Sequence, residues 1–355
     1  MISPFLSLST SSILTLSYVG GLYVSSKTRV GTLDESTGLK RTKDDADVVR
    51  ARLKTIGYVA AGSVVLTLAV LSGADEGTER GKHPLIRCIT LLSKIGLPLP
   101  YPSILTNAFP PLDPPLFSFL LTQAKHVLYG LGLTATLYFG PLVTLALDKE
   151  LPGQENFEYK RDVQSRWDNV WGLRNYVVGP LTEEIVFRGC IVGLTSSTRS
   201  STLFHSIFLT PFYFAVAHLH HAYEVWADHQ YSTTGLKIGL THATFQLLYT
   251  SLFGWYANWL FVKSASLAPS LVAHVWCNIM GLPAPFDDAS RLAVPDAKEQ
   301  RRFEKDLLNV SNERERAHVL DASKAIQSKL KRRKWIVWTS HVMGVAGFAW
   351  AIRMS

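Results

Sequence analysis

The sequence predicts an all-α, polytopic membrane protein, with about eight transmembrane helices that enclose a polar intramembrane cavity. Hydrophobic residues make up 47% of the 355 residues and charged residues only 18%, against roughly 25% charged residues in soluble domains. The charges gather in the segments 27–54, 149–166 and 286–334, with long apolar stretches between them. This alternation of apolar and charged segments is typical of a chain that crosses a membrane several times.

Eight apolar segments are candidate spans, and a bilayer core of about 30 Å requires about 20 helical residues for each. They cover about 2–24, 55–74, 127–147, 175–197, 203–219, 238–262, 268–283 and 335–352. The fifth and seventh are short, so we expect them inside the helix bundle. No basic residue precedes Lys27 in the first segment, which favours a retained helix over a signal peptide. One integral membrane domain is expected over 1–355.

The distribution of Lys and Arg predicts the orientation of these spans. The loops after the odd-numbered spans are rich in basic residues, which places them in the cytoplasm and both termini on the opposite side. The net charge of +8 therefore indicates loops near anionic lipid rather than nucleic-acid binding. The charged cytoplasmic segment 286–334 is expected to hold a helix or a hairpin. The proline-rich loop 75–126 is expected to include an interfacial helix at 84–95.

The fourth span carries three charged residues within six positions, namely Glu183, Glu184 and Arg188. Each charge costs about 2.5–3.5 kcal/mol at the centre of a membrane helix, so charges there are usually functional. Glu184 and Arg188 are four residues apart, the spacing of an ion pair on one helix face. Glu183 points about 100° away and has no basic partner on its own turn. We expect a structural pair and one free carboxylate, the alternative being that all three residues only hold helices together.

Two further spans carry polar side chains on apolar helices. Phe214 and His218 share one face of the fifth span, and His274 and Asn278 share one face of the seventh. His220 and His221 follow at the membrane boundary, where an interfacial position is expected. The alternative roles are a packed, hydrogen-bonded imidazole and an interhelical hydrogen bond of the carboxamide.

A carboxylate and several hydrogen-bond donors on three helices are the minimum for hydrolysis by an activated water. A metal ion bound by His218, His274 and Glu183 is the main alternative. The sequence contains neither HExxH nor a Cys/His ligand spacing, so a site without metal or another cofactor is favoured. It has no GxSxG motif, and Cys190 and Cys277 lack the partners of a thiolate nucleophile.

Taken together, the three segments resemble the type II CAAX prenyl endopeptidases, whose pattern is EExxxR, then FxxxH, then HxxxN. In this sequence the three motifs are Glu183-Glu184-x-x-x-Arg188, Phe214-x-x-x-His218 and His274-x-x-x-Asn278. Each motif alone is short, whereas all three in this order on apolar segments are specific. The resemblance covers about 175–283, the expected catalytic core helices, and nothing transfers to 27–54 or 286–334.

The resemblance implies an enzyme of the endoplasmic reticulum membrane with an active site open to the cytoplasm. Such enzymes cleave prenylated CAAX proteins after the lipidated cysteine and release the last three residues. The implied substrates are farnesylated or geranylgeranylated proteins such as small GTPases. Glu183 and His218 match the residues that activate water. His274 and Asn278 match those that stabilise the oxyanion.

Two other functions use the same residue types. A non-proteolytic membrane scaffold needs no unpaired intramembrane carboxylate, so the intact motif set argues against it. A transporter or proton relay also uses buried Glu and His. Transporters more often show internal repeats and interrupted spans, which this sequence lacks.

Overall fold

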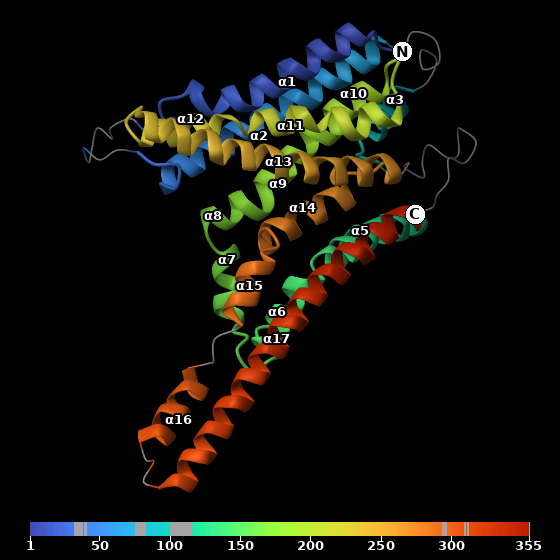
Figure 1. Cartoon of the computed structure of the whole chain (residues 1–355). Coiled ribbons are helices and arrows are strands. Elements are labelled where there is room, and N and C mark those ends of the chain that lie inside the picture. Colours follow the sequence, from blue (N-terminus) through green and yellow to red (C-terminus); the bar gives the residue numbers. More distant parts are fainter. Residues whose placement is uncertain are drawn as a thin grey trace. The chain divides into compact units, whose positions relative to one another are not determined.

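The computed structural model describes residues 1–31, 38, 41–74, 83–99, 116–292, 297–308, 310 and 312–354. These residues form helices and connecting turns, and the described part contains no strand apart from an isolated bridge between Ile2 and Thr198 (Figure 1). The all-α class is therefore confirmed, and the chain is a multi-pass membrane protein. Much of the predicted loop 75–126 lies outside the described residues, but its expected helix is present as α3 (Pro84–Lys94).

The chain divides into two compact units. Unit 1 comprises Met1–Leu131 and Arg166–Asn278, and unit 2 comprises Gly132–Ser165 and Ile279–Ser355. Each of the three motifs of the predicted site lies in unit 1. The single membrane domain over 1–355 stays a prediction.

Unit 1 begins with two long antiparallel helices, α1 (Pro4–Val24) and α2 (Ala46–Gly73), which pack side by side (Figure 1). The Ser3 side chain caps α1 by accepting a hydrogen bond from the Leu6 amide. The helices approach closely at Gly21, where a Cβ atom would lie 3.1 Å from a methyl group of Val59. A small residue at such a crossing is typical of helix packing in membranes.

The fourth predicted span is one continuous helical path of five consecutive elements. These are α8 (Val170–Gly172), η2 (Leu173–Val178), α9 (Gly179–Glu183), η3 (Glu184–Val192) and α10 (Gly193–Ser196). The η elements have the wider turn of a π-helix, which occurs frequently at functional sites. Gly189 lets this path lie against the end of α3, since a Cβ there would be 2.9 Å from the carbonyl oxygen of Ile95.

The remaining motifs of unit 1 lie at the short helices α11 (Pro211–Ala217) and α14 (Ala268–Met280). The other elements of this region are η4 (His205–Leu209), α12 (His220–Asp228) and the long helix α13 (Thr233–Ser264). The Asn258 side chain on α13 donates hydrogen bonds to the Ser206 carbonyl and to the Thr210 hydroxyl. These buried bonds fasten α13 to the turn that leads into α11.

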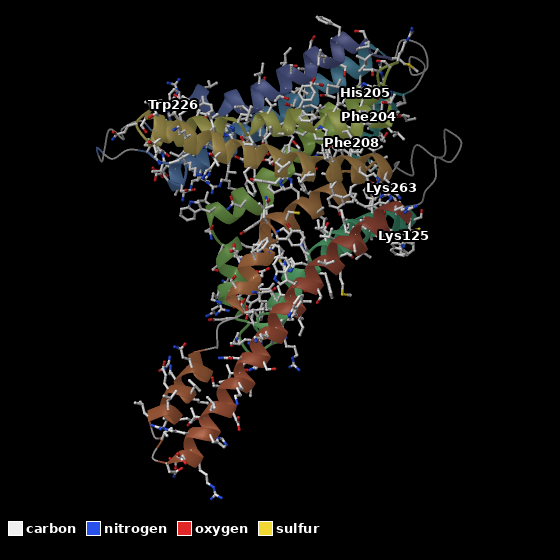
Figure 2. The ribbon with its side chains drawn as sticks, viewed as in Figure 1. Lys125, Phe204, His205, Phe208, Trp226 and Lys263 are labelled. Atoms are coloured by element: carbon white, nitrogen blue, oxygen red, sulfur yellow. The ribbon has the colours of Figure 1, made fainter. Side chains whose placement is uncertain are left out.

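Unit 1 has two distinct ends. At one end the Met1 amino group donates to the Ala74 carbonyl, and the Ile2 amide donates to the Ser197 carbonyl. At the other end α1, α2 and α12 meet around Glu224, which bonds to Tyr23 and Arg52. Figure 2 shows Phe204, Phe208 and Lys263 towards the first end and Trp226 at the second.

Unit 2 is built around the long helix α17 (Glu313–Met354). It also contains the end of α5 (Leu116–Leu137) and the elements α6 (Phe139–Leu147), η1 (Lys160–Gln164), α15 (Pro285–Arg291) and α16 (Ala297–Leu308). Gly140 lies directly against the His341 ring, and Arg291 pairs with Asp148 at 2.8 Å. The expected helices of 286–334 are present as α15, α16 and the first half of α17.

Among the described residues, α1, α2 and α17 are long and apolar enough to cross a membrane, and the bent pair α5–α6 makes a fourth candidate. The pair bends by 69°, whereas one span was expected over 127–147. Pro141 follows the bend, and it has no N–H to donate to the carbonyl of Leu137 four residues earlier, which its ring also crowds. The segments that carry the motifs do not pass the same test, because they are short or contain charged residues.

Candidate active site

A cavity of about 530 Å³ lies within unit 1. This volume falls in the range of roughly 300–1,000 Å³ that is usual for ligand pockets. Its wall includes Glu183, His218 and Asn278, one residue from each predicted motif segment. The other wall residues come from α1, α2, the segment 43–44, the path 174–187, the end of α11 and the start of α12. The fold therefore brings the three motifs to one cavity.

Glu184 and Arg188 lie behind the cavity wall, fully buried, with 0% and 1% of their side chains exposed. Arg188 Nη1 is 3.1 Å from Glu184 Oε1, as the helical spacing predicts. The guanidinium carbon also lies 4.4 Å from the centre of the Phe214 ring and 5.3 Å from that of Phe253. A buried charge is costly unless it is paired, and the carboxylate and the two ring faces offset that cost.

His274 lies between the two glutamates. Its Nδ1 is 2.8 Å from Glu184 Oε1, and its Nε2 is 3.5 Å from Glu183 Oε2. The carboxylate of Glu184 accepts only, so Nδ1 carries the proton. Glu184 is thus the partner of both Arg188 and His274, whereas the sequence related it to Arg188 alone. We call Glu184, Arg188 and His274 the interior cluster.

Glu183 has fewer and longer contacts than Glu184. About 23% of its side chain is exposed, and it faces the cavity. Among the described residues, no hydrogen bond reaches its carboxylate, and its ion-pair contact is the one with His274 at 3.5 Å. This arrangement leaves lone pairs of Glu183 available to a water molecule or a substrate.

The orientation of His218 is set by its own helix. Nδ1 lies 2.7 Å from the carbonyl oxygen of Phe214, one helical turn earlier. A carbonyl oxygen only accepts, so Nδ1 is the protonated nitrogen and the Nε2 lone pair remains available. Any residue at position 214 would supply this backbone carbonyl, whereas the Phe214 ring itself packs against the His218 ring, with centroids 4.6 Å apart.

Asn278 is exposed and lies at the cavity near the Arg174–Asn175 segment. Its Nδ2 donates a hydrogen bond of 2.8 Å to the carbonyl oxygen of Asn175. A carboxamide nitrogen has two hydrogens, so one N–H remains for another acceptor. Asn278 lines the cavity, whereas His274, one turn earlier on α14, contacts the two glutamates.

A second carboxylate cluster lies at the Tyr23 end of unit 1, and we call Arg52, His221 and Glu224 the mouth cluster. Glu224 Oε1 accepts from Arg52 Nη2 at 3.1 Å, and Oε2 lies 3.2 Å from His221 Nδ1. The side chains of Arg52 and Glu224 are only 12% and 7% exposed. The sequence placed His221 at the membrane boundary but gave no sign of Arg52, which lies 172 residues from Glu224 in the chain.

The electrostatics of this end are well defined. Burial alone would raise the pKa of Glu224, but the hydrogen bond from His221 and the charge of Arg52 outweigh it and lower this pKa to about 2. Burial, followed by the charge of His221, lowers the pKa of His220 to about 4. At neutral pH, Glu224 is therefore ionised and the His220 imidazole is neutral.

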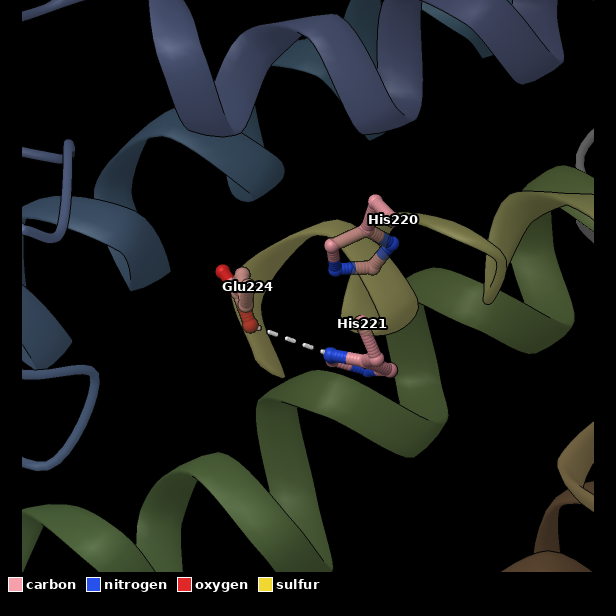
Figure 3. A group of neighbouring side chains, drawn as sticks. All are labelled: His220, His221 and Glu224. Carbon is pink, nitrogen blue, oxygen red and sulfur yellow. Dashed lines mark hydrogen bonds and ion pairs between the residues drawn. The ribbon is translucent and has the colours of Figure 1, made fainter. Parts of the chain in front are cut away.

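His220, His221 and Glu224 also form a group of potential metal ligands, with ligand atoms within 4.8 Å of one another (Figure 3). Two imidazoles and a carboxylate suit a borderline cation such as zinc. The positive charge of Arg52 on the same carboxylate opposes the entry of a cation. The predicted alternative set His218, His274 and Glu183 does not form such a group in the part of the chain that the structure describes.

Comparison with known proteins gives the family. Residues 165–280 match the model of the family described as type II CAAX prenyl endopeptidase Rce1-like. A human protein named CAAX prenyl protease 2 is 30% identical over 278 residues, which cover 76% of this chain and 69% of the human protein. The chain belongs to this family. The matched region contains all three motifs and the mouth residues of α12.

Two further relatives are more similar over shorter stretches. The CAAX prenyl protease 2 of Arabidopsis thaliana is 37% identical over 47% of this chain and 57% of its own length. The probable CAAX prenyl protease 2 of Schizosaccharomyces pombe is 38% identical over 44% of this chain and 55% of its own length. The chain thus spans little more than half the length of these two relatives. No solved structure matches the chain.

Proposed function

We propose that this protein is an intramembrane endopeptidase that cleaves prenylated C-terminal CAAX sequences after the lipidated cysteine and releases the terminal tripeptide. The observation that carries the proposal is the uncommitted carboxylate of Glu183 at a cavity that also exposes His218. An intramembrane carboxylate without a strong partner is costly, and a role as general base accounts for it.

The proposed reaction begins with a water molecule held by Glu183 and by Nε2 of His218. Glu183 takes one proton from the water as its oxygen attacks the carbonyl carbon of the lipidated cysteine. The tetrahedral oxyanion then collapses, the C–N bond breaks, and the proton passes from Glu183 to the leaving amine. The products are a new carboxyl group on the prenylated cysteine and a free tripeptide, so water is the only co-reactant.

Two groups are proposed to stabilise the oxyanion, as the family resemblance implies. Asn278 retains one N–H beyond its bond to Asn175. His274, which is flanked by the carboxylates of Glu183 and Glu184, can donate from Nε2 in its imidazolium form. The Glu184–Arg188 pair then has a positioning role, because it fixes His274 and does not contact the reacting atoms.

The substrate class fits a site in a membrane protein. A prenyl chain gains about 0.8 kcal/mol for each CH₂ buried in lipid, so it holds the substrate at the bilayer. Relatives named CAAX prenyl protease 2 support the choice of CAAX substrates. Farnesylated or geranylgeranylated CAAX proteins such as small GTPases, in the endoplasmic reticulum membrane, are the proposed substrates.

The proposed orientation opens the cavity to the cytoplasm. The basic segment 41–54 and α12 lie at the end of unit 1 opposite Met1 and Ser197. Basic residues favour the cytoplasmic side. A glycosylation acceptor inserted at 196–202 should then be modified and one at 40–45 should not, and the reverse pattern would overturn the orientation.

The function is tested with purified protein in liposomes and a farnesylated CAAX peptide in H₂¹⁸O, with and without a chelator. We expect the free tripeptide and one ¹⁸O atom in the new carboxyl group, at equal rates with and without the chelator. Peptide binding without cleavage would indicate a scaffold, and ion flux without cleavage would indicate a transporter. Loss of cleavage on chelation would overturn the metal-free mechanism.

A further inference from the structure

The cavity carries more positive charge at its mouth than the proposed chemistry uses. Lys43, Arg52 and Arg174 all line it, and none of them belongs to the three motifs. Arg52 is neutralised by Glu224 in the mouth cluster. The charges left to explain are therefore those of Lys43 and Arg174, together with the acidic neighbour Asp44.

Arg174 fastens the segment 43–44 to the cavity wall. Its Nη1 donates to the Lys43 carbonyl at 3.2 Å and to Asp44 Oδ1 at 3.1 Å, and its Nε donates to Asn175 Oδ1 at 2.9 Å. Nη2 takes part in none of these bonds. A guanidinium has five N–H donors, so Arg174 keeps donors for a ligand.

Lys43 is the surplus cation of the cavity. Asp44 is the acidic partner of Arg174, and no partner for the Lys43 ammonium occurs in the part of the chain that the structure describes. The Lys43 backbone is held by Arg174, so its side chain starts from a fixed point at the mouth. A lysine held beside a guanidinium with donors to spare favours an anionic ligand.

The separation between Glu183 and Arg174 along their helical path suits the length of the released tripeptide. Glu183 and Arg174 are nine residues apart on one continuous helical path. At about 1.5 Å per residue this separation is about 13 Å along the axis, and slightly less through the π segments. Three extended residues span about 10 Å. With the scissile carbonyl at Glu183, the end of a tripeptide therefore comes within reach of the Arg174 side chain.

We propose that Lys43 and Arg174 bind the C-terminal carboxylate of the peptide substrate. This inference rests on the proposed function, because only a substrate cleaved three residues from its end places a carboxylate at that position. The contact fixes the C-terminus of the substrate at a set distance from Glu183, so the bond three residues before the C-terminus lies at the site of cleavage. It thereby selects C-terminal peptides over internal segments of the same sequence.

The test compares two farnesylated peptides that differ only at the C-terminus, one with a free carboxylate and one with an amide. For the unchanged protein in liposomes of neutral lipid, we expect kcat/KM to be about ten-fold higher for the acid, which corresponds to about 1.4 kcal/mol. Lys43→Gln should lower kcat/KM for the acid, through KM, and leave the amide unchanged. Arg174→Gln should do the same for the acid, and Arg174→Lys should restore part of the loss.

Lys54→Gln is the matched control, because Lys54 is an exposed lysine of α2 that does not line the cavity. It should keep the acid-to-amide ratio of the unchanged protein. Lys43→Gln is the primary variant, since Arg174→Gln also releases the segment 43–44.

Three results would overturn the inference. Equal cleavage of the acid and the amide by the unchanged protein would show that no contact with the C-terminal carboxylate contributes to binding. An equal loss on both peptides in Lys43→Gln indicates a structural role. An effect of Lys43→Gln that occurs only in liposomes with anionic lipid indicates a headgroup contact instead. Absence of cleavage of either peptide is a different result, which defeats the proposed function itself.

Discussion

The interior cluster and the mouth cluster are both built on a buried carboxylate that holds an arginine and a histidine. In the interior, Glu184 holds Arg188 on its own helix and His274 on α14. At the mouth, Glu224 holds Arg52 from α2 and His221 on its own helix, one turn earlier. The same chemistry thus serves two purposes. The interior cluster fixes His274 next to Glu183, and the mouth cluster joins the N-terminal helices to α12.

The two clusters differ in their contact with water. Glu184 and Arg188 are completely buried, so removal of one charge leaves the other stranded. Arg52 and Glu224 keep some exposure, and Arg52 also donates to the Thr28 carbonyl. We therefore expect loss of the interior carboxylate to destabilise the protein more than loss of the carboxylate at the mouth.

The largest effect on stability is expected for Glu184→Ala. It leaves the buried guanidinium of Arg188 without a counter-charge, which costs about 3–5 kcal/mol when a buried pair is broken. The measurement is the free energy of unfolding in mixed micelles. Glu184→Gln, which keeps the shape and one hydrogen-bond acceptor, serves as the matched variant and should lose less. A loss below that of Glu224→Ala would contradict the comparison.

A smaller loss is expected for Glu224→Ala. The change removes the charge-assisted bonds from Arg52 and His221, and hydrogen bonds to charged groups contribute about 1.5–3 kcal/mol. Water reaches the remaining charge of Arg52, so the penalty stays below that of the interior variant. Unfolding in the same micelles measures it, and an unchanged midpoint would show that the mouth cluster contributes nothing to stability.

The mouth cluster should also give a pH dependence. Because the pKa of Glu224 is lowered from 4.5 to about 2 in the folded state, its stabilising contribution is complete above about pH 4.5. As the pH falls from 4.5 towards 2, the unfolded state binds a proton that the folded state does not, so the contribution is lost. The difference in unfolding free energy between the unchanged protein and Glu224→Gln should therefore shrink over this range. A constant difference would contradict the assignment.

The smallest effect on stability is expected for an exposed ion pair of α2, the helix that also carries Arg52. Arg50 and Asp47 are 62% and 82% exposed, and they lie 2.9 Å apart on α2. Such pairs contribute about 0–1 kcal/mol. Arg50→Gln should therefore leave the unfolding midpoint nearly unchanged. Arg50→Gln serves as the reference for Arg52, which lies two residues away. A loss of stability as large as that of Glu224→Ala would show that removal of any charge from this region destabilises the protein.

The contacts that the sequence could predict are those within a helix. The Glu184–Arg188 pair follows from a spacing of four residues, and the separate direction of Glu183 follows from the turn of the helix. The FxxxH spacing likewise brings His218 to the Phe214 carbonyl. The bend between α5 and α6 also had a signal, because Gly140 and Pro141 are unfavourable inside a helix.

The contacts that the sequence could not predict join distant helices. His274 reaches both glutamates only because α14 packs against the fourth span, 90 residues away in the chain. Arg52 meets Glu224 only because α2 begins beside α12. Lys43 and Arg174 come together for the same reason. The residue pattern of one segment does not reveal which other segment packs against it.

The measurement that tests the central claim most directly is tripeptide release by Glu183→Gln in liposomes with a farnesylated CAAX peptide. The variant keeps the size of the side chain and removes the base. Its unfolding free energy should stay close to that of the unchanged protein, because Glu183 is not part of the interior cluster. We expect kcat to fall by about 10²–10⁴-fold in this folded variant. Cleavage at an unchanged rate would contradict the assignment of Glu183 as the general base.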